Sequence, residues 1–167
     1  MTSGAALLSF LTIQRLFELV ISARNTRSLR ARGALEFGAR HYPAMIALHG
    51  SWLVSLWFFG WNRPALPALV LVFALLQAAR IWVMATLGER WTTRIIVPLD
   101  EPPIHTGPFR FVRHPNYLIV AIEIPCVSLA LGLAWHAALF TILNLTMLWW
   151  RIRAEDRAYA AQPPASP

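Results

Sequence analysis

Long apolar runs constrain this chain more than any other feature of its sequence. Residues 5–23, 43–61 and 65–87 are each predominantly apolar, and residues 118–150 form a fourth run. A helix needs roughly 20 apolar residues to cross about 30 Å of hydrocarbon. Each of the first three runs therefore predicts one membrane-spanning helix, and we expect an integral membrane protein.

The fourth run is too long for a single crossing. As one helix its 33 residues would extend roughly 50 Å. Leu131 to His136 offers a plausible turn, so we expect a tight helical hairpin there, with a second helix that continues through Arg151 to Tyr159. The sequence thus predicts an all-α membrane bundle of about five transmembrane helices, with a hairpin at its C-terminal end.

Charged residues are scarce, and their placement predicts the orientation of the bundle. Only 14% of the residues are charged, whereas a soluble domain usually has about 25%. The net charge of +7 could indicate a nucleic-acid partner, but the arginines lie between the apolar runs, which favours a role in membrane orientation and no nucleic acid. Twelve of the fifteen arginines fall within residues 24–41, 88–115 and 151–157. Because basic loops stay cytoplasmic, we expect the N-terminus outside and the C-terminus in the cytosol.

The connection between the third and fourth runs has the composition of an ordered segment. Loops longer than about 12–15 residues are usually functional or disordered, and the many aromatic and aliphatic side chains here disfavour disorder. Gly107-Pro108 predicts a turn, and Pro115 suits the first position of the fourth helix, with His114 as its cap. The free N–H groups of that helix end, beside Arg113, are suited to an anion such as a carboxylate or a phosphate.

The helix expected after the last apolar run carries charges of both signs. Arg151, Glu155 and Tyr159 are spaced four residues apart and therefore share one face, with Asp156 on an adjoining face. A carboxylate pair at the mouth of an apolar bundle could hold ribose hydroxyls. The alternative is a solvated helix end with salt bridges on its surface.

Together, these two segments resemble a known enzyme family. Residues 107–117 read Gly-Pro-Phe-Arg-Phe-Val-Arg-His-Pro-Asn-Tyr, and residues 151–156 read Arg-Ile-Arg-Ala-Glu-Asp. In this order they are similar to the G-P-[YF]-x-x-x-R-H-P-x-Y and R-I-x-x-E-[ED] segments of the isoprenylcysteine carboxyl methyltransferase family and its phospholipid N-methyltransferase relatives. The resemblance implies a multi-span enzyme that binds S-adenosylmethionine (SAM) on the cytosolic side and methylates a lipophilic acceptor.

The resemblance also implies which residues bind the cofactor. In the loop and at the start of the fourth helix these are His105, Gly107, Arg113, His114, Asn116 and Tyr117, and in the tail they are Arg151, Glu155 and Asp156.

Further positions resemble a bacterial branch of the family, which O-methylates long-chain alkylpyrones and alkylresorcinols. This likeness implies a phenolic or pyrone hydroxyl as methyl acceptor, a bacterial cytoplasmic membrane as location, and membrane lipid as surroundings. The positions that carry it include Asn25, Tyr42, Met45 and Thr93. They also include Trp91, Arg94, His41 and His49, and we assign these last four residues to substrate binding.

Three other reactions stay open as alternatives. Prenylcysteine methyltransferases usually have a glycine soon after the tyrosine of this motif, whereas Leu118 and Ile119 follow Tyr117 here. This departure disfavours carboxyl methylation of an isoprenylcysteine-type substrate, and N-methylation of a phospholipid is a second alternative. Sterol reductases carry a similar R-H-P-x-Y segment near a nicotinamide site, so an NADPH-dependent membrane reductase is the third.

Four arginine and glutamate side chains lie within the apolar runs, and ionisable groups at membrane depth are functional-site hypotheses by default. Arg15 and Glu18 are three residues apart and are expected to neutralise one another. Glu123 could accept a proton from an enol or phenol, and Arg80 could contact the substrate or the cofactor carboxylate; both are our catalytic candidates. The alternative is a structural ion pair of Glu123 with Arg80 or Arg15.

We expect a single methyltransferase domain over residues 1–167. In it, residues 1–87 form three spans with a basic loop, residues 88–162 form the cofactor loop, hairpin and tail helix, and residues 163–167 form a disordered tail. No metal is expected, because the sequence offers no cluster of ligands at a metal-binding spacing.

Overall fold

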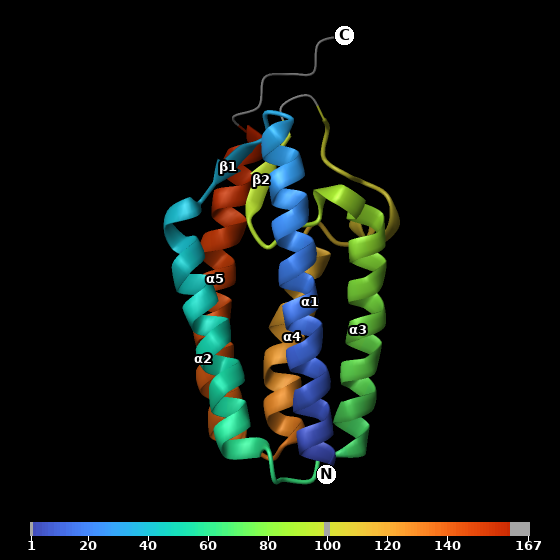
Figure 1. Cartoon of the computed structure of the whole chain (residues 1–167), viewed down its shortest axis with the longest axis vertical. Coiled ribbons are helices and arrows are strands. Elements are labelled where there is room, and N and C mark those ends of the chain that lie inside the picture. The colour runs from blue at the N-terminus through green and yellow to red at the C-terminus, as the bar shows by residue number, and fades with distance from the viewer. Residues whose placement is uncertain (1, 99–100, 161–167) are drawn as a thin grey trace.

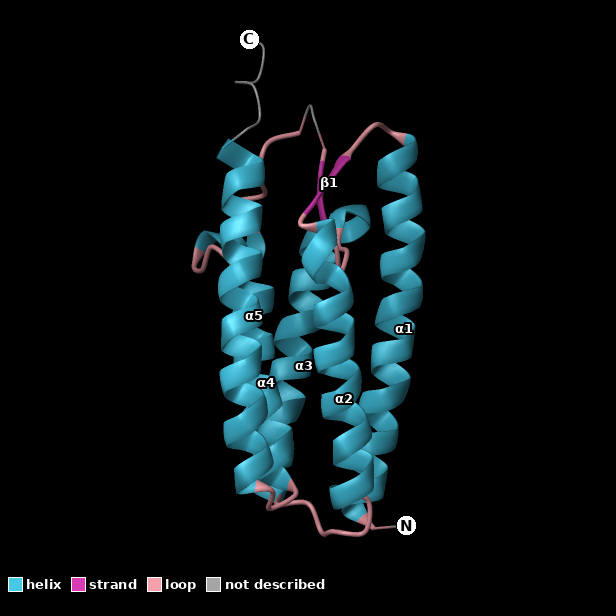
Figure 2. Cartoon of the chain, turned by 90° about the vertical axis from the view of Figure 1, so that its left-hand side faces the viewer, coloured by secondary structure: helices cyan, strands magenta, loops and turns pink. Residues whose placement is uncertain are grey.

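The computed structural model describes residues 2–98 and 101–160, which form five α-helices and a small β-ribbon (Figure 1). The helices run side by side along the long axis (Figure 2). The predicted all-α membrane bundle is confirmed, and three of the helices are long and apolar enough to cross a membrane. The tail at residues 163–167, predicted to be disordered, lies outside the described residues. The helices are α1 (Ser3–Ala31), α2 (Tyr42–Gly60), α3 (Pro67–Leu87), α4 (Pro115–Ala130) and α5 (Ala134–Ala160).

The fourth apolar run folds as two helices. The chain turns between α4 and α5 at Leu131–Leu133, where Gly132 adopts a left-handed φ of 68° that favours glycine. The predicted hairpin is therefore present at the expected position. Its first helix has only 16 residues, so it spans about 24 Å, and its second helix continues to Ala160.

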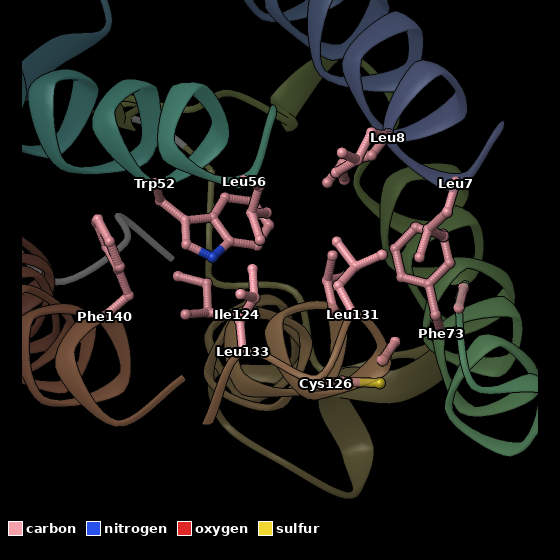
Figure 3. Packing of buried hydrophobic residues seen from close by; sticks show 14 residues of the cluster. Leu7, Leu8, Trp52, Leu56, Phe73, Ile124, Cys126, Leu131, Leu133 and Phe140 are labelled. Carbon is pink, nitrogen blue, oxygen red and sulfur yellow. The ribbon is translucent and has the colours of Figure 1, made fainter. Parts of the chain in front are cut away.

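The hydrophobic core fills the end of the bundle at which the N-terminus lies. Figure 3 shows Trp52 and Leu56 from α2 facing Ile124 and Leu133 from the α4–α5 hairpin, while Leu131 of the hairpin lies near Leu7 of α1. These side chains are almost completely buried. The same end is closed by the backbone, because the Gly4 N–H donates to the carbonyl of Arg63 in the α2–α3 connection.

A two-stranded ribbon lies at the opposite end of the bundle and was not predicted. Strand β1 (Leu35–Phe37) pairs antiparallel with β2 (Ile95–Val97). Ile95 and Val97 pack with Ala158 of α5, so the ribbon joins the first basic connection to the tail helix. Three short 3-10 helices complete the described connections: η1 (Ala39–His41), η2 (Gly88–Arg90) and η3 (Gly107–Arg110).

Candidate active site

The end of the bundle that carries the ribbon encloses a cavity of about 740 Å³. All five helices contribute to its walls, and so does the connection between α3 and α4. Leu16, Leu53 and Val120 are among its apolar lining residues, whereas the connection and α5 supply most of the charged ones. A volume of this size lies within the range of about 300–1,000 Å³ that is usual for small-molecule sites.

The start of α4 and the tail of α5 meet at this cavity. The Tyr117 hydroxyl donates a hydrogen bond of 2.6 Å to Glu155 Oε2. The His114 ring stacks on the Tyr117 ring with centroids 5.4 Å apart, and its Nδ1 lies 3.7 Å from the same carboxylate oxygen. Beside them, Arg113 Nη2 lies 2.9 Å from Asp156 Oδ1. The two segments of the sequence motif therefore form one cluster.

Local backbone geometry positions this cluster. Pro115 occupies the first turn of α4, and the carbonyl of His114 accepts from the N–H groups of Tyr117 and Leu118. His114 holds the predicted cap position, but its ring makes no capping hydrogen bond and so stays available to the tail. At η3 the loop approaches α3 so closely that a Cβ on Gly107 would lie 2.6 Å from the Thr86 hydroxyl.

The connection after α3 is fixed by side chains from α1 and α5. The Asn25 amide donates to the carbonyls of Trp91 at 2.8 Å and Gly88 at 3.2 Å. Arg151 Nη2 donates to the Thr93 carbonyl at 2.9 Å, and its guanidinium lies 5.6 Å from the centroid of the Tyr117 ring. Arg151 thereby links the tail helix to both the connection and α4.

Arg94 lines the cavity and also contacts the β-ribbon. Its Nη1 donates to Glu36 Oε1 at 2.6 Å, and its guanidinium lies 3.9 Å from the centroid of the Tyr42 ring. Burial alone would raise the pKa of Glu36, but the hydrogen bonds and charges of Arg94 and Arg30 outweigh burial and hold this pKa below its ordinary value.

A second charged group lies deeper in the bundle. Arg15 Nη1 lies 2.6 Å from Glu18 Oε2, and Arg15 Nη2 contacts the Glu123 carboxylate at 2.5 Å. Arg80 is ion-paired with Glu123 and lies 3.5 Å from Glu18 Oε2, while the Gln77 amide donates to Glu123 Oε1 at 3.0 Å. The two arginines balance the two carboxylates, which is how buried charges at this depth are stabilised.

Most of the predicted site residues line the cavity, but three do not. Glu123 is buried in its ion pairs and does not reach the cavity, and Gly107 packs against Thr86. His41 faces a separate hollow, which it shares with Phe37 and Arg157. The lining residues among the predicted ones are His105, Arg113, His114, Asn116, Tyr117, Arg151, Glu155, Asp156, Trp91, Arg94, His49 and Arg80.

Sequence reasoning missed that Arg15 and Glu18 line the same cavity. Their three-residue spacing correctly indicated that they pair with each other. The contact from Arg15 across to Glu123 joins residues 108 positions apart. The sequence had already offered Arg15 as one possible partner of Glu123, because opposite charges in separate apolar spans stabilise one another.

Fold and cavity define an integral membrane protein with a charged pocket at one end of its helical bundle. The chain belongs to the isoprenylcysteine carboxyl methyltransferase (ICMT) family, whose sequence profile matches residues 68–161. Membership of this family indicates a membrane methyltransferase.

Two relatives match almost the whole chain. The uncharacterised protein YpbQ of Bacillus subtilis is 32% identical over 165 residues, which cover 91% of this chain and 94% of that protein. An uncharacterised protein of Haemophilus influenzae is 27% identical over 162 residues, which cover 91% of this chain and 92% of that protein. No solved structure matches the chain.

Proposed function

We propose that this protein is a SAM-dependent methyltransferase of a bacterial cytoplasmic membrane, which transfers a methyl group to the hydroxyl of a long-chain phenolic or pyrone lipid. The observation that carries the proposal is the Tyr117–Glu155 hydrogen bond, which joins the two motif segments at a cavity with apolar walls. In this proposal residues 1–167 act as one domain, with the cofactor machinery in residues 88–162 and three N-terminal spans completing the cavity.

Several buried polar atoms at the cavity make no hydrogen bond, which suits a cofactor with many polar groups. Within residues 2–98 and 101–160, the Trp91 indole N–H, Asn116 Oδ1 and His114 Nε2 are buried and make no hydrogen bond. Buried polar groups normally find partners, so these atoms are suited to a polar ligand. SAM fits the residue set, because Arg113 and Arg151 can attract its carboxylate, while Glu155 and Asp156 can hold its ribose or amino group.

Bound SAM supplies a methyl group on a positively charged sulfur, which is already a good leaving group. The protein must therefore align the attacking oxygen with the methyl carbon and exclude water. The hydrogen bond between Tyr117 of α4 and Glu155 of α5 holds one end of the cavity in a fixed geometry. The apolar lining residues Leu16 and Leu53 give a lipid tail a place within the same cavity.

Glu123 and Arg80, the two residues that the sequence suggested as catalytic, differ in their access to the cavity. Arg80 lines the cavity and can face an acceptor, whereas Glu123 acts on the cavity through Arg15 and Arg80, to which it is paired. His49, Trp91 and Arg94 line the acceptor side in this proposal, and the half-buried His41, whose ring nitrogens are buried without a hydrogen bond, can contact the polar part of an arriving lipid.

The reaction is tested by incubating purified protein and isotopically labelled SAM with a membrane lipid extract, and by identifying the product with mass spectrometry. We expect a labelled methyl ether of a long-chain phenol or pyrone. A base-labile methyl ester would indicate carboxyl methylation, and a labelled phospholipid head group would indicate N-methylation. Thermal stabilisation by NADPH, with none by SAM, would overturn the proposal in favour of a reductase.

The cofactor site is tested with Glu155→Ala. Loss of a hydrogen-bonding carboxylate costs about 1.5–3 kcal/mol, so we expect SAM affinity, measured by calorimetry, to fall by at least about tenfold. Glu89→Ala is the matched control, because Glu89 is an exposed carboxylate outside the cavity, paired with Arg32. Equal SAM affinity of the Glu155 variant and the wild type would contradict the assignment.

A further inference from the structure

His49 lies on α2, faces the cavity, and is held in one neutral form by its own helix. Its Nδ1 is 2.9 Å from the carbonyl oxygen of Met45. A carbonyl can only accept a hydrogen bond, so Nδ1 must carry the proton. In a neutral imidazole the other nitrogen then bears a free lone pair. Among the described residues nothing hydrogen-bonds to His49 Nε2, which is left as a proton acceptor at the cavity.

Glu123 is poorly placed for the same task. The residue is 1% exposed and does not line the cavity. Both carboxylate oxygens already accept hydrogen bonds, from Arg15, Arg80 and Gln77. Protonating this carboxylate would leave two buried guanidinium groups without a counter-charge, which is strongly unfavourable.

We propose that His49 Nε2 accepts the proton of the acceptor hydroxyl during methyl transfer, and that Glu123 is a positioning residue that holds Arg15 at the cavity wall. This inference rests on the proposed function and deepens it. The hydroxyl oxygen forms a bond to the methyl carbon, the S–CH₃ bond breaks with its electron pair remaining on sulfur, and the O–H proton passes to Nε2. The proton then leaves for solvent, which restores the neutral ring.

A base at this position also distinguishes between the acceptor classes. A phenol is largely protonated at neutral pH and must lose its proton to become a strong nucleophile. A carboxylate acceptor carries no proton at neutral pH and needs no base. The fixed tautomer of His49 therefore favours a weakly acidic hydroxyl over a prenylcysteine carboxylate as the substrate of this cavity.

Charged groups from three other helices act on His49. Arg15 of α1 and Arg151 of α5 are positive, and Glu123 of α4 is negative. Arg15 also lines the cavity, so its guanidinium can stabilise the negative charge that develops on the acceptor oxygen as the proton leaves. Proton acceptor and charge-stabilising group thus belong to the same cavity wall.

The test is His49→Gln, assayed with SAM and a long-chain alkylresorcinol. The glutamine amide can occupy the position of Nε2 but accepts no proton at neutral pH. We expect kcat to fall roughly a hundredfold, because general base catalysis typically contributes 10²- to 10⁴-fold. SAM affinity by calorimetry should be unchanged. The wild-type rate should rise with pH as a histidine loses its proton, and the variant should lack this rise.

A second acceptor separates proton transfer from pocket shape. A long-chain alkyl nitrophenol needs no base when it is assayed at a pH at which its hydroxyl is already ionised. The His49→Gln variant should therefore methylate this phenol at a rate close to that of the wild type. Without turnover, the absorbance of this phenol bound to wild-type protein should show ionisation at a lower pH than when it is bound to the variant. Ser51→Ala, on an exposed part of α2, is the matched control.

Two results would overturn the assignment. Equal rates and equal pH profiles of wild type and His49→Gln on the alkylresorcinol would show that His49 takes no proton. An equal loss on both phenols would show that His49 only shapes the pocket. Failure of the proposed function is distinct, because wild-type protein would then methylate neither phenol.

Discussion

Arg80 and Glu123 are almost completely buried, so each depends on the other for its charge. Each also has a second contact of opposite sign, to Glu18 and Arg15 respectively. Removing one partner of a buried pair leaves an uncompensated charge, which costs about 3–5 kcal/mol. Exposed pairs such as Arg32–Glu89 contribute no more than about 1 kcal/mol.

We therefore expect Glu123→Ala to lower the free energy of unfolding in detergent by about 3–5 kcal/mol. Arg80→Ala should have a similar effect, and the double variant should lose less than the sum of the two, because it removes both charges together. Glu89→Ala serves as the exposed control. Strict additivity of the two buried substitutions would contradict a direct pair.

At the level of single residues, the sequence predicted the motif cluster and left the deep contacts open. Helical spacing placed Arg151 and Glu155 on one face, and both line the cavity. The partner of Glu123 could not be decided, because helix packing selects among Arg15, Arg80 and water. Which ring nitrogen of His49 carries the proton is decided by the Met45 carbonyl one turn away. Composition does not reveal this contact.

At the level of the elements, the sequence predicted a helix wherever it contains a long apolar run. The first apolar run stops at residue 23, yet α1 continues to Ala31. Its last turns are stabilised by polar contacts instead, since Ser22 and Asn25 bind the connection at Thr93 and Trp91. The β-ribbon was missed because its strands are three residues long and are separated in sequence by α2 and α3, so no local turn signals a hairpin.

The ribbon makes a testable contribution to stability through Glu36. Its pKa in the folded protein lies below the ordinary value of 4.5, because Arg94 and Arg30 outweigh burial. A lowered carboxyl pKa stabilises the fold above the unfolded value, and this stabilisation is lost as pH falls through the folded value. We expect Glu36→Gln to unfold at a lower temperature than the wild type near neutral pH.

The same comparison should be repeated at falling pH. As the pH falls from 4.5 through the lower pKa of the folded protein, the two melting temperatures should converge, because Glu36 becomes protonated in the folded wild type. Glu101→Gln, a more exposed carboxylate paired with Arg90, controls for general effects of acid. A difference that stays constant through this pH range would show that Glu36 acts by shape and not by charge.

The whole molecule is packed at one end and hollow at the other. Core side chains fill the end that holds the N-terminus, and the cavity lies toward the opposite end. Figure 1 shows the ribbon and the end of α5 at that opposite end. The three arginine-rich segments all belong to the hollow end, whereas Arg63 belongs to the packed end. If basic segments stay in the cytoplasm, the cavity opens where SAM is synthesised, which the proposed function requires.

This orientation can be measured with cysteine variants, because the one native cysteine, Cys126, is buried. Arg63→Cys and Arg32→Cys place a thiol at the packed and the hollow end respectively. In intact bacteria, a membrane-impermeant maleimide should label the Arg63 variant, and it should label the Arg32 variant only after the cells are permeabilised. Wild-type protein, which should stay unlabelled, is the control for Cys126.

The reverse labelling pattern would place the hollow end outside the cell. The cavity would then face a compartment that does not make SAM, and the proposed methyl transfer would lose its cofactor supply even if the purified protein bound SAM. Labelling of both variants in intact cells would instead indicate an even number of crossings between the two sites, which the single helix α2 and its flanking loops do not provide. Orientation and chemistry are therefore tested together at this scale.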